Sequence, residues 1–320
     1  MFACSMDMVM VTRKRATTYG KAHSFGGDWT STKLDILGKY LSAYTKALKD
    51  QPTPTRRFVK AYIDAFAGTG YRSMGHDDAT REGNLLFPDL AESAPQDLLD
   101  GSARLALKTQ PRFDRYIFIE RSPRRCQELE GLKVEFPDLA QDIRIEQGEA
   151  NERIRALCGK EKDWSARRAV LFLDPYGMQV EWETIGAIAA TEAIDLWLLF
   201  PLGVGVNRLL TRSGDIPPTW RVRLDKLLGN QDWYDKFYRV ESEPNLFGTE
   251  EDHVVKATTE SIGRYFVDRL KDIFPGVAEE PGVLRNSARC PLYLLCFAAS
   301  NKNAAPIALR IANHLLKAVR

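Results

Sequence analysis

The chain has 320 residues, of which 44% are hydrophobic and 28% are charged, and its formal net charge is +2. This composition is ordinary for a soluble globular protein with a sizeable core. The small net charge does not require a polyanionic partner.

The five cysteines are scattered, odd in number and without a Cys-x-x-Cys pair. This argues for a reducing cytosol and against a disulfide framework or zinc site, so we expect no bound metal. Cys290 and Cys296 lie in an apolar, strand-like region where a cysteine is usually a small buried hydrophobe. No stretch approaches the ~20 apolar residues that span a bilayer, so we expect a cytoplasmic protein with no membrane partner.

Apolar periodicity predicts alternating helices and strands. The predicted strands are 58–66, 116–120, 143–147, 170–173 and 193–200, and helices are expected at 30–48, 103–108, 151–157, 182–190 and from 122 onwards. Such alternation predicts an α/β, doubly wound and mostly parallel sheet. Residues 282–286 and 291–298 form a predicted C-terminal hairpin that closes the sheet, followed by a last helix.

Two segments interrupt this pattern. Residues 71–100 are polar with little periodicity, which predicts a long loop, a kind of segment that often binds ligands. Residues 201–274 are rich in aromatic residues and arginine and predict a helical insertion or cap. Because there is no flexible linker or repeat, we expect one domain spanning residues 1–320.

The first predicted strand runs into a glycine turn. Residues 62–70 read Tyr-Ile-Asp-Ala-Phe-Ala-Gly-Thr-Gly, so Asp64 is followed by Gly68 and Gly70. A turn of this kind lets backbone N–H groups approach a nucleotide-like cofactor. A nicotinamide-dependent oxidoreductase is the less favoured alternative, because Ser73 stands where its fingerprint has a third glycine.

Four acidic residues each follow a predicted strand: Asp64, Glu120, Glu149 and Asp174. Right-handed crossovers bring the carboxyl ends of parallel strands to one edge, where ligands of such sheets bind. At this edge Asp64 can engage a positive ammonium group, Glu120 can accept hydrogen bonds from ribose hydroxyls, and Glu149 can accept from an adenine amino group. The alternative is that Glu120 and Glu149 are ordinary surface acids.

The segment Asp174-Pro175-Tyr176 is the candidate reaction centre. A carboxylate and a proline carbonyl can hold both N–H groups of an exocyclic amine, whose lone pair is delocalised into the ring. An aromatic side chain can stack on the base, which is worth ~1–3 kcal/mol. The reaction would then depend on alignment and proximity. The alternative is a tight turn that ends the strand, since Pro175 and Gly177 favour turns.

A basic run crowds one short region of the chain. It consists of Arg104, Lys108, Arg112, Arg115, Arg121, Arg124 and Arg125. Such a run is usually a solvated face, and contact with nucleic acid is the alternative.

Taken together, these segments resemble the three-Cys-motif partner protein family over nearly the whole chain. The matching segments are Trp29-Thr30-x-x-Lys33-Leu34, residues 62–70, Gly101-Ser102, residues 118–120, residues 172–177 and residues 291–293. That family resembles class I S-adenosylmethionine-dependent methyltransferases and is named for a separate partner protein with a three-cysteine, iron–sulfur-like motif. The rRNA adenine-N6 methyltransferases show similar elements in the same order.

The resemblance implies a Rossmann-like class I methyltransferase fold with a mostly parallel seven-stranded sheet, and S-adenosylmethionine as cofactor. The implied cofactor-binding residues are Asp64, Ala65, Phe66, Gly68, Gly70, Ser102, Glu120, Gly148 and Glu149. The implied catalytic residues are Asp174, Pro175 and Tyr176, and the substrate-side residues are Trp29 and Lys33.

The chain departs from the Asp/Asn-Pro-Pro-aromatic pattern of amino-methyltransferases, because Tyr176 replaces the second proline. We expect methyl transfer to a nucleobase amine in RNA or DNA. The alternative is a methyltransferase-fold scaffold for a three-Cys-motif protein, with little or no catalysis.

Overall fold

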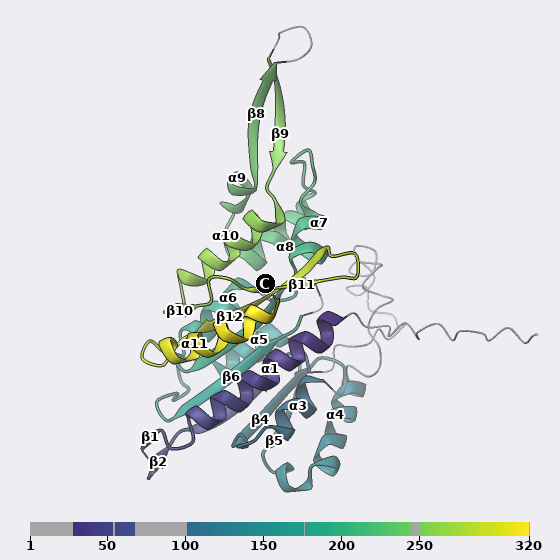
Figure 1. Ribbon diagram of the computed structural model, residues 1–320. Helices are drawn as coiled ribbons and strands as arrows, with labels where there is room; N and C mark the ends of the chain where they lie inside the picture. Colours follow the sequence, from purple (N-terminus) through teal and green to yellow (C-terminus); the bar gives the residue numbers. More distant parts are fainter. Residues whose placement is uncertain (1–27, 54, 68–100, 176, 245–249, 320) are drawn as a thin grey trace, which may run out of the picture.

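The computed structural model describes residues 28–53, 55–67, 101–175, 177–244 and 250–319. A central twisted sheet carries helices on both faces (Figure 1). Its strands, in spatial order, are β10 (Gly276–Val277), β12 (Pro291–Ala299), β7 (Ile194–Phe200), β6 (Arg167–Leu173), β3 (Val59–Asp64), β4 (Arg115–Glu120) and β5 (Ile143–Gln147), with β11 (Gly282–Arg285) also paired to β12.

Strands β7, β6, β3, β4 and β5 pair in parallel, whereas β12 is antiparallel to β7. Both β10 and β11 pair with the other edge of β12, so the eight strands occupy seven positions. This arrangement confirms the predicted class I methyltransferase fold with its C-terminal hairpin. Strand β10 was not predicted because only two residues form it.

Helices cover both faces of the sheet, and for this reason its strands are continuous apolar runs. One face packs against α1 (Asp28–Ala47), α3 (Ser102–Lys108), α4 (Pro123–Glu135) and α11 (Ala305–Leu316). The other face packs against α5 (Ala150–Leu157), α6 (Trp182–Ala189), α8 (Pro218–Leu228) and α10 (Thr259–Lys271). The short elements are β1 (Pro52–Thr53), β2 (Arg56–Arg57), η3 (Pro137–Leu139) and η5 (Lys317–Val319).

None of the described helices is long and apolar enough to cross a membrane. The cysteine expectation holds for Cys296, which is buried, but is wrong for Cys290, which is exposed at the start of β12. Cys290 lies just before the strand enters the core, so its side chain remains in solvent.

The interval 201–274 contains more than the predicted helices. It holds η4 (Leu202–Val206), α7 (Asn207–Leu209), α8, α9 (Trp233–Phe237), β8 (Tyr238–Pro244), β9 (Glu250–Lys256) and α10. The antiparallel pair β8–β9 corrects the prediction of a purely helical interval. Helix α10 packs on the sheet and therefore belongs to the core fold. The predicted loop 71–100 lies outside the described residues.

The β8–β9 hairpin, hereafter the arm, projects from the body (Figure 1). Its base is anchored, because Lys256 Nζ donates 2.8 Å hydrogen bonds to the carbonyls of Asn207 and Leu210, and Tyr238 OH donates a 2.8 Å bond to the Thr211 carbonyl. Beyond the base the described residues of the arm are largely exposed. The arm therefore has a fixed root and an open distal part.

Helix α1 is fixed to the sheet by a buried hydrogen bond. Tyr40 OH donates to Asp195 Oδ2 on β7 over 2.5 Å. Burial raises the pKa of Asp195 to about 7, although the Tyr40 hydrogen bond and the charge of Arg168 act in the opposite direction. The same helix carries Trp29 and Lys33, the two predicted substrate-side residues, so this contact helps to fix their position relative to the sheet.

The buried carboxyl of Asp195 should make stability depend on pH. Its folded pKa of about 7 lies above the unfolded value of 3.8, so the folded state binds the proton more tightly. Its stabilising contribution is therefore full below about pH 4 and is lost as the pH rises to about 7, by up to about 1.4 kcal/mol per pH unit. Urea unfolding at several pH values should show that the free energy of unfolding falls less steeply with rising pH in Asp195→Asn than in wild type. In Tyr40→Phe the fall in this free energy should extend to higher pH, because the hydrogen bond that lowers the pKa of Asp195 is lost. Equal slopes in all three proteins would contradict this.

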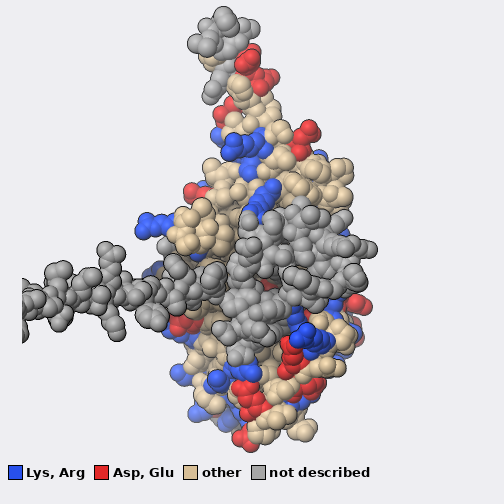
Figure 2. All heavy atoms as spheres, turned by 90° about the vertical axis from the view of Figure 1, so that its right-hand side faces the viewer, with Lys and Arg blue, Asp and Glu red and all other residues tan. Residues whose placement is uncertain are grey.

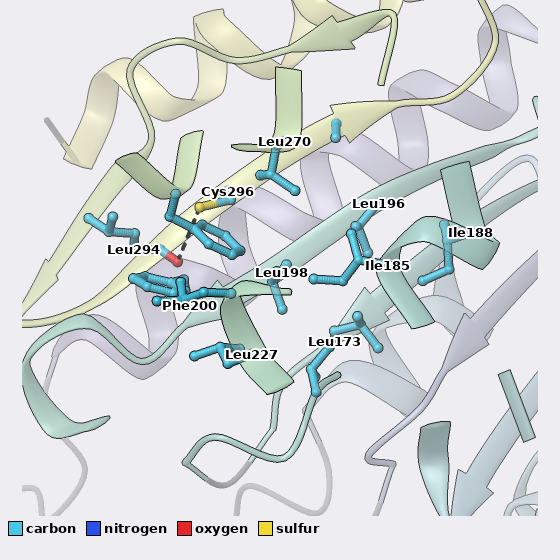
Figure 3. Packing of buried hydrophobic residues seen from close by; sticks show 14 of the residues in the cluster. Leu173, Ile185, Ile188, Leu196, Leu198, Phe200, Leu227, Leu270, Leu294 and Cys296 are labelled. Atoms are coloured by element: carbon cyan, nitrogen blue, oxygen red, sulfur yellow. Dashed lines mark hydrogen bonds between the residues drawn. The ribbon is translucent and has the colours of Figure 1, made fainter. Parts of the chain in front are cut away.

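The core beneath the insertion depends on stacked rings. The ring centroids of Phe200 on β7 and Phe266 on α10 lie 3.9 Å apart, with an angle of 17° between the ring planes. Phe200 lies close to Leu198, Leu227 and Leu294 in the same core cluster (Figure 3).

Phe266→Ala should lower the free energy of unfolding by about 3–5 kcal/mol, because it leaves a cavity. Val222→Ala, at a side chain 53% exposed on α8, is the control and should change it by less than about 0.5 kcal/mol. Chemical denaturation measures both, and a Phe266→Ala loss as small as that of the control would contradict the packing described.

Candidate functional site

The four acidic residues follow four adjacent strands, in the spatial order Asp174, Asp64, Glu120 and Glu149. Asp64 is in register with Phe118 of β4 and Phe172 of β6, so Glu120 and Asp174 lie two residues further along the neighbouring strands. Adjacent strands are about 4.8 Å apart, so the set spans about 14 Å of one sheet edge. The predicted convergence at the carboxyl edge therefore holds at the level of strand register.

Asp64 is enclosed within the protein, with a residue exposure of 1%. Its Oδ2 accepts from Ser102 Oγ (2.6 Å) and Tyr62 OH (3.3 Å), and its Oδ1 accepts from the Phe66 N–H (3.3 Å). Burial raises the pKa of Asp64 to about 6, the charge of Asp174 adds to the rise, and the three donors oppose it. A cation brought near this edge would favour the ionised form.

Ser102 is hydrogen-bonded within the protein and does not cap its own helix. Helix α3 begins at Ser102, and its cap residue, Gly101, has no side chain. The Ser102 hydroxyl instead links α3 to Asp64. Ala65 is buried beside this contact and Phe66 is half-buried against the core.

The two carboxylate oxygens of Glu120 differ in their contacts. Its Oε1 accepts from the Ser122 N–H over 2.7 Å. Its Oε2 is buried and forms an ion pair with Arg125 Nη1 at 3.9 Å, but it accepts no hydrogen bond from the part of the chain that the structure describes. An unpartnered buried acceptor is costly, so this oxygen is suited to a ligand that donates a hydrogen bond.

Glu149 is exposed and forms the N-terminal cap of α5. Its Oε2 accepts from the Glu152 N–H over 2.9 Å. The Gly148 N–H donates to the Glu120 carbonyl over 3.0 Å, which joins the ends of β5 and β4. Glu149 therefore caps a helix, a structural role that was not predicted when it was interpreted as a cofactor-binding residue or a surface acid.

Asp174 forms a close ion pair with Lys33 of α1. The Lys33 side chain is only 4% exposed and that of Asp174 is 26% exposed. Pro175 is buried, and Gly177 adopts φ 71°, a left-handed conformation that favours glycine. The left-handed Gly177 is compatible with a tight turn after the strand, and the catalytic role of Asp174-Pro175 stays a prediction.

Aromatic rings flank this ion pair. Lys33 Nζ lies 5.1 Å from the centroid of the Trp29 ring, and Trp29 packs on Tyr293 of β12 with centroids 5.3 Å apart. Sequence reasoning named Trp29 and Lys33 but gave no sign of Tyr293 as the ring partner, because the two lie in distant parts of the chain. Gly68, Gly70 and Tyr176 lie outside the described residues.

Two further expectations concern metal and basic surface. Within the described ranges, no group of three or more His, Cys, Asp or Glu residues is arranged to hold a metal ion. Much of the basic run is paired with acids: Arg104 with Glu135, Arg115 with Asp142, Arg124 with Glu128 and Arg125 with Glu120. This pairing favours the solvated-face reading of the run.

Comparison with known proteins gives a likeness at the level of the fold. No protein-family model and no curated protein matches the sequence. Protein LPL1258 from Legionella pneumophila is 14% identical, with 78% of this chain and 90% of that chain covered and a TM-score of 0.35.

Two named methyltransferases are also similar. The putative methyltransferase YhhF from Escherichia coli is 11% identical, covering 69% of this chain and 86% of that one, with a TM-score of 0.28. Magnesium protoporphyrin IX methyltransferase from Synechocystis, solved with bound SAH, is 13% identical. The match covers 71% of this chain and 84% of that one, with a TM-score of 0.28. At such values the likeness carries no functional argument, and the fold assignment rests on the strand order.

The Lys33–Asp174 pair should be asymmetric in its effect on stability. Asp174→Asn leaves the ammonium of Lys33 buried and uncompensated, which should cost about 3 kcal/mol. Lys33→Met should cost less than half as much, because Asp174 retains access to water. Thermal or urea unfolding measures both effects.

The matched control is the Lys39–Asp35 pair on the same helix, whose side chains are 60% and 58% exposed. Lys39→Met should cost no more than about 0.5 kcal/mol. A loss for Asp174→Asn no greater than that of Lys39→Met would show that the pair is not buried in solution.

Proposed function

We propose that the chain is an S-adenosylmethionine-dependent methyltransferase that acts on an exocyclic amine of a nucleobase in RNA or DNA. One observation carries the proposal: Asp174-Pro175 directly follows β6, and the three neighbouring strands carry Asp64 and Glu120 as their last residues and Glu149 two residues after the last. A metal or covalent nucleophile is not needed for such a transfer, which relies on position and alignment.

The residues present fit the cofactor. The buried Oε2 of Glu120, which accepts no hydrogen bond from the described residues, is a suitable acceptor for a ribose hydroxyl. A positive ammonium group close to Asp64 would favour the ionised form of its carboxyl. Glu149 would border the adenine. When bound, S-adenosylmethionine supplies an electrophilic methyl group on a sulfonium.

Asp174 would accept one N–H of the amine, and the Pro175 carbonyl would accept the other. The Lys33 ammonium already compensates the charge of Asp174, so the amine must share this carboxylate with Lys33 or displace it. Lys33 thereby limits the positions that the acceptor nitrogen can take. Trp29, half-buried with its ring centroid 5.1 Å from Lys33 Nζ, offers an aromatic surface on which a base could stack.

The arm bears on where a nucleic acid would run. Its strands contain five acidic residues against Arg239 and Lys256, and Lys256 is engaged at the root. Figure 2 shows acidic side chains along the arm and lysine and arginine side chains near its base. Phosphates are repelled by the former, so a nucleic-acid substrate would approach the body and not the arm.

A second candidate function is a methyltransferase-fold scaffold for a three-Cys-motif protein. The observation that favours it is the Lys33–Asp174 pair, because the carboxylate that an amine needs is already occupied. Under this alternative the cofactor edge would be retained while transfer is weak or absent.

Calorimetry with S-adenosylmethionine, S-adenosylhomocysteine and NAD tests the proposal. We expect binding of the first two only. Glu120→Ala should bind them with an affinity about tenfold or more below that of wild type, because the ribose loses a buried hydrogen-bond acceptor. Glu128→Ala, at an exposed acid on α4, is the matched control and should bind like the wild type.

Tritiated-methyl transfer to total RNA and DNA then separates the two functions. Label that disappears in Asp174→Ala, with cofactor binding retained, would support catalysis on a nucleobase. Cofactor binding without label in RNA or DNA would contradict the nucleobase proposal and favour the scaffold. An absence of cofactor binding would overturn the methyltransferase proposal itself.

A further inference from the structure

We infer that Asn151 is a positioning residue that holds the cofactor side of the site and the segment after Asp174-Pro175 at a fixed separation. The inference rests on the proposed function for its catalytic meaning. Its structural basis, a single buried amide that joins two loops, stands independently of that function.

The Asn151 side chain, in the first turn of α5, uses all of its polar atoms. Its Nδ2 donates to Glu149 Oε1 and to the Gln179 carbonyl, each over 2.8 Å. Its Oδ1 accepts from the Glu181 N–H and from Thr184 Oγ1, each over 2.9 Å. The residue is 5% exposed, so water does not replace these partners readily.

The four partners belong to two different parts of the site. Glu149 lies at the end of β5, on the proposed adenine side. Gln179 and Glu181 lie in the segment that leads from Pro175 into α6, a helix whose cap residue, Glu181, makes no side-chain cap bond of its own. Asn151 thus anchors the start of α6 and orients Glu149 with the same group.

Only an amide satisfies this environment. A carboxylate cannot donate to Glu149 or to the Gln179 carbonyl, and an aliphatic side chain removes all four hydrogen bonds made by residue 151. A change of about 1 Å in the separation of the two loops would misalign the methyl donor and the amine, which costs rate out of proportion to the movement.

The surrounding charges make Asn151→Asp informative. The Glu181 carboxylate is already paired with Arg155 (2.8 Å) and Lys226 (3.1 Å). The new carboxylate would lie at hydrogen-bond distance from Glu149, whereas the nearby Arg155 is shared with Glu181 and with Thr184 Oγ1 (3.2 Å). Two carboxylates at hydrogen-bond distance share a proton at low pH and repel each other when both are ionised.

The experiment measures the dissociation constant of S-adenosylhomocysteine for wild type, Asn151→Asp and Asn151→Ala at about pH 5.5 and about pH 8. Relative to wild type at the same pH, we expect Asn151→Asp to bind about tenfold more weakly at the higher pH and within about threefold at the lower pH. Asn151→Ala should be weakened by a similar factor at both. Asn303→Asp, the same change in an exposed turn, is the control and should match wild type.

Hydrogen–deuterium exchange without ligand gives an independent readout. Residues 149–152 and 177–184 should both exchange faster in Asn151→Ala than in wild type, and thermal denaturation confirms that the variants fold. The inference would be overturned if the ratio of the Asn151→Asp dissociation constant to that of wild type did not change with pH. It would also be overturned if only one of the two segments exchanged faster in Asn151→Ala. If wild type binds no S-adenosylhomocysteine, the proposed function fails, and the exchange data still decide whether Asn151 joins the loops.

Discussion

The parallel pairing of β6, β3, β4 and β5 is the constraint on which the site depends. It fixes the register of the strands and brings four acidic residues to one sheet edge. Negative charge gathered in this way must be compensated within the protein or by a ligand. Lys33 compensates Asp174, and three hydrogen-bond donors surround Asp64, yet the pKa of Asp64 is still raised to about 6. The edge is therefore suited to a positively charged ligand.

Helix α1 supplies what the sheet lacks. It contributes Lys33 and Trp29 at its first turns and is tied to β7 further along by Tyr40 and Asp195. A shift of the helix would move the Lys33 ammonium away from Asp174, so the buried Tyr40–Asp195 contact helps to maintain the ion pair at the sheet edge. The buried Tyr40–Asp195 bond and the Lys33–Asp174 ion pair at the sheet edge are therefore linked through the same helix.

Sequence periodicity was sufficient to predict the central sheet, but not the β8–β9 arm or the side-chain contacts between distant parts of the chain. Buried parallel strands such as β6 and β7 are apolar throughout, which makes them recognisable. The arm was missed because its strands are short and largely exposed, and their few aliphatic residues, Val240, Val254 and Val255, form no continuous apolar run. The ion pair of Lys33 with Asp174 joins residues 141 positions apart, and no local pattern encodes such a contact. The cap role of Glu149 depends likewise on where α5 begins.

The most direct measurement of the central claim is a crystal structure with bound S-adenosylhomocysteine. The account predicts that the ligand lies along the edge formed by β6, β3, β4 and β5, with its ribose on Glu120, its adenine beside Glu149 and its amino group toward Asp64. A ligand bound elsewhere, or one whose ribose does not contact Glu120 Oε2, would contradict it.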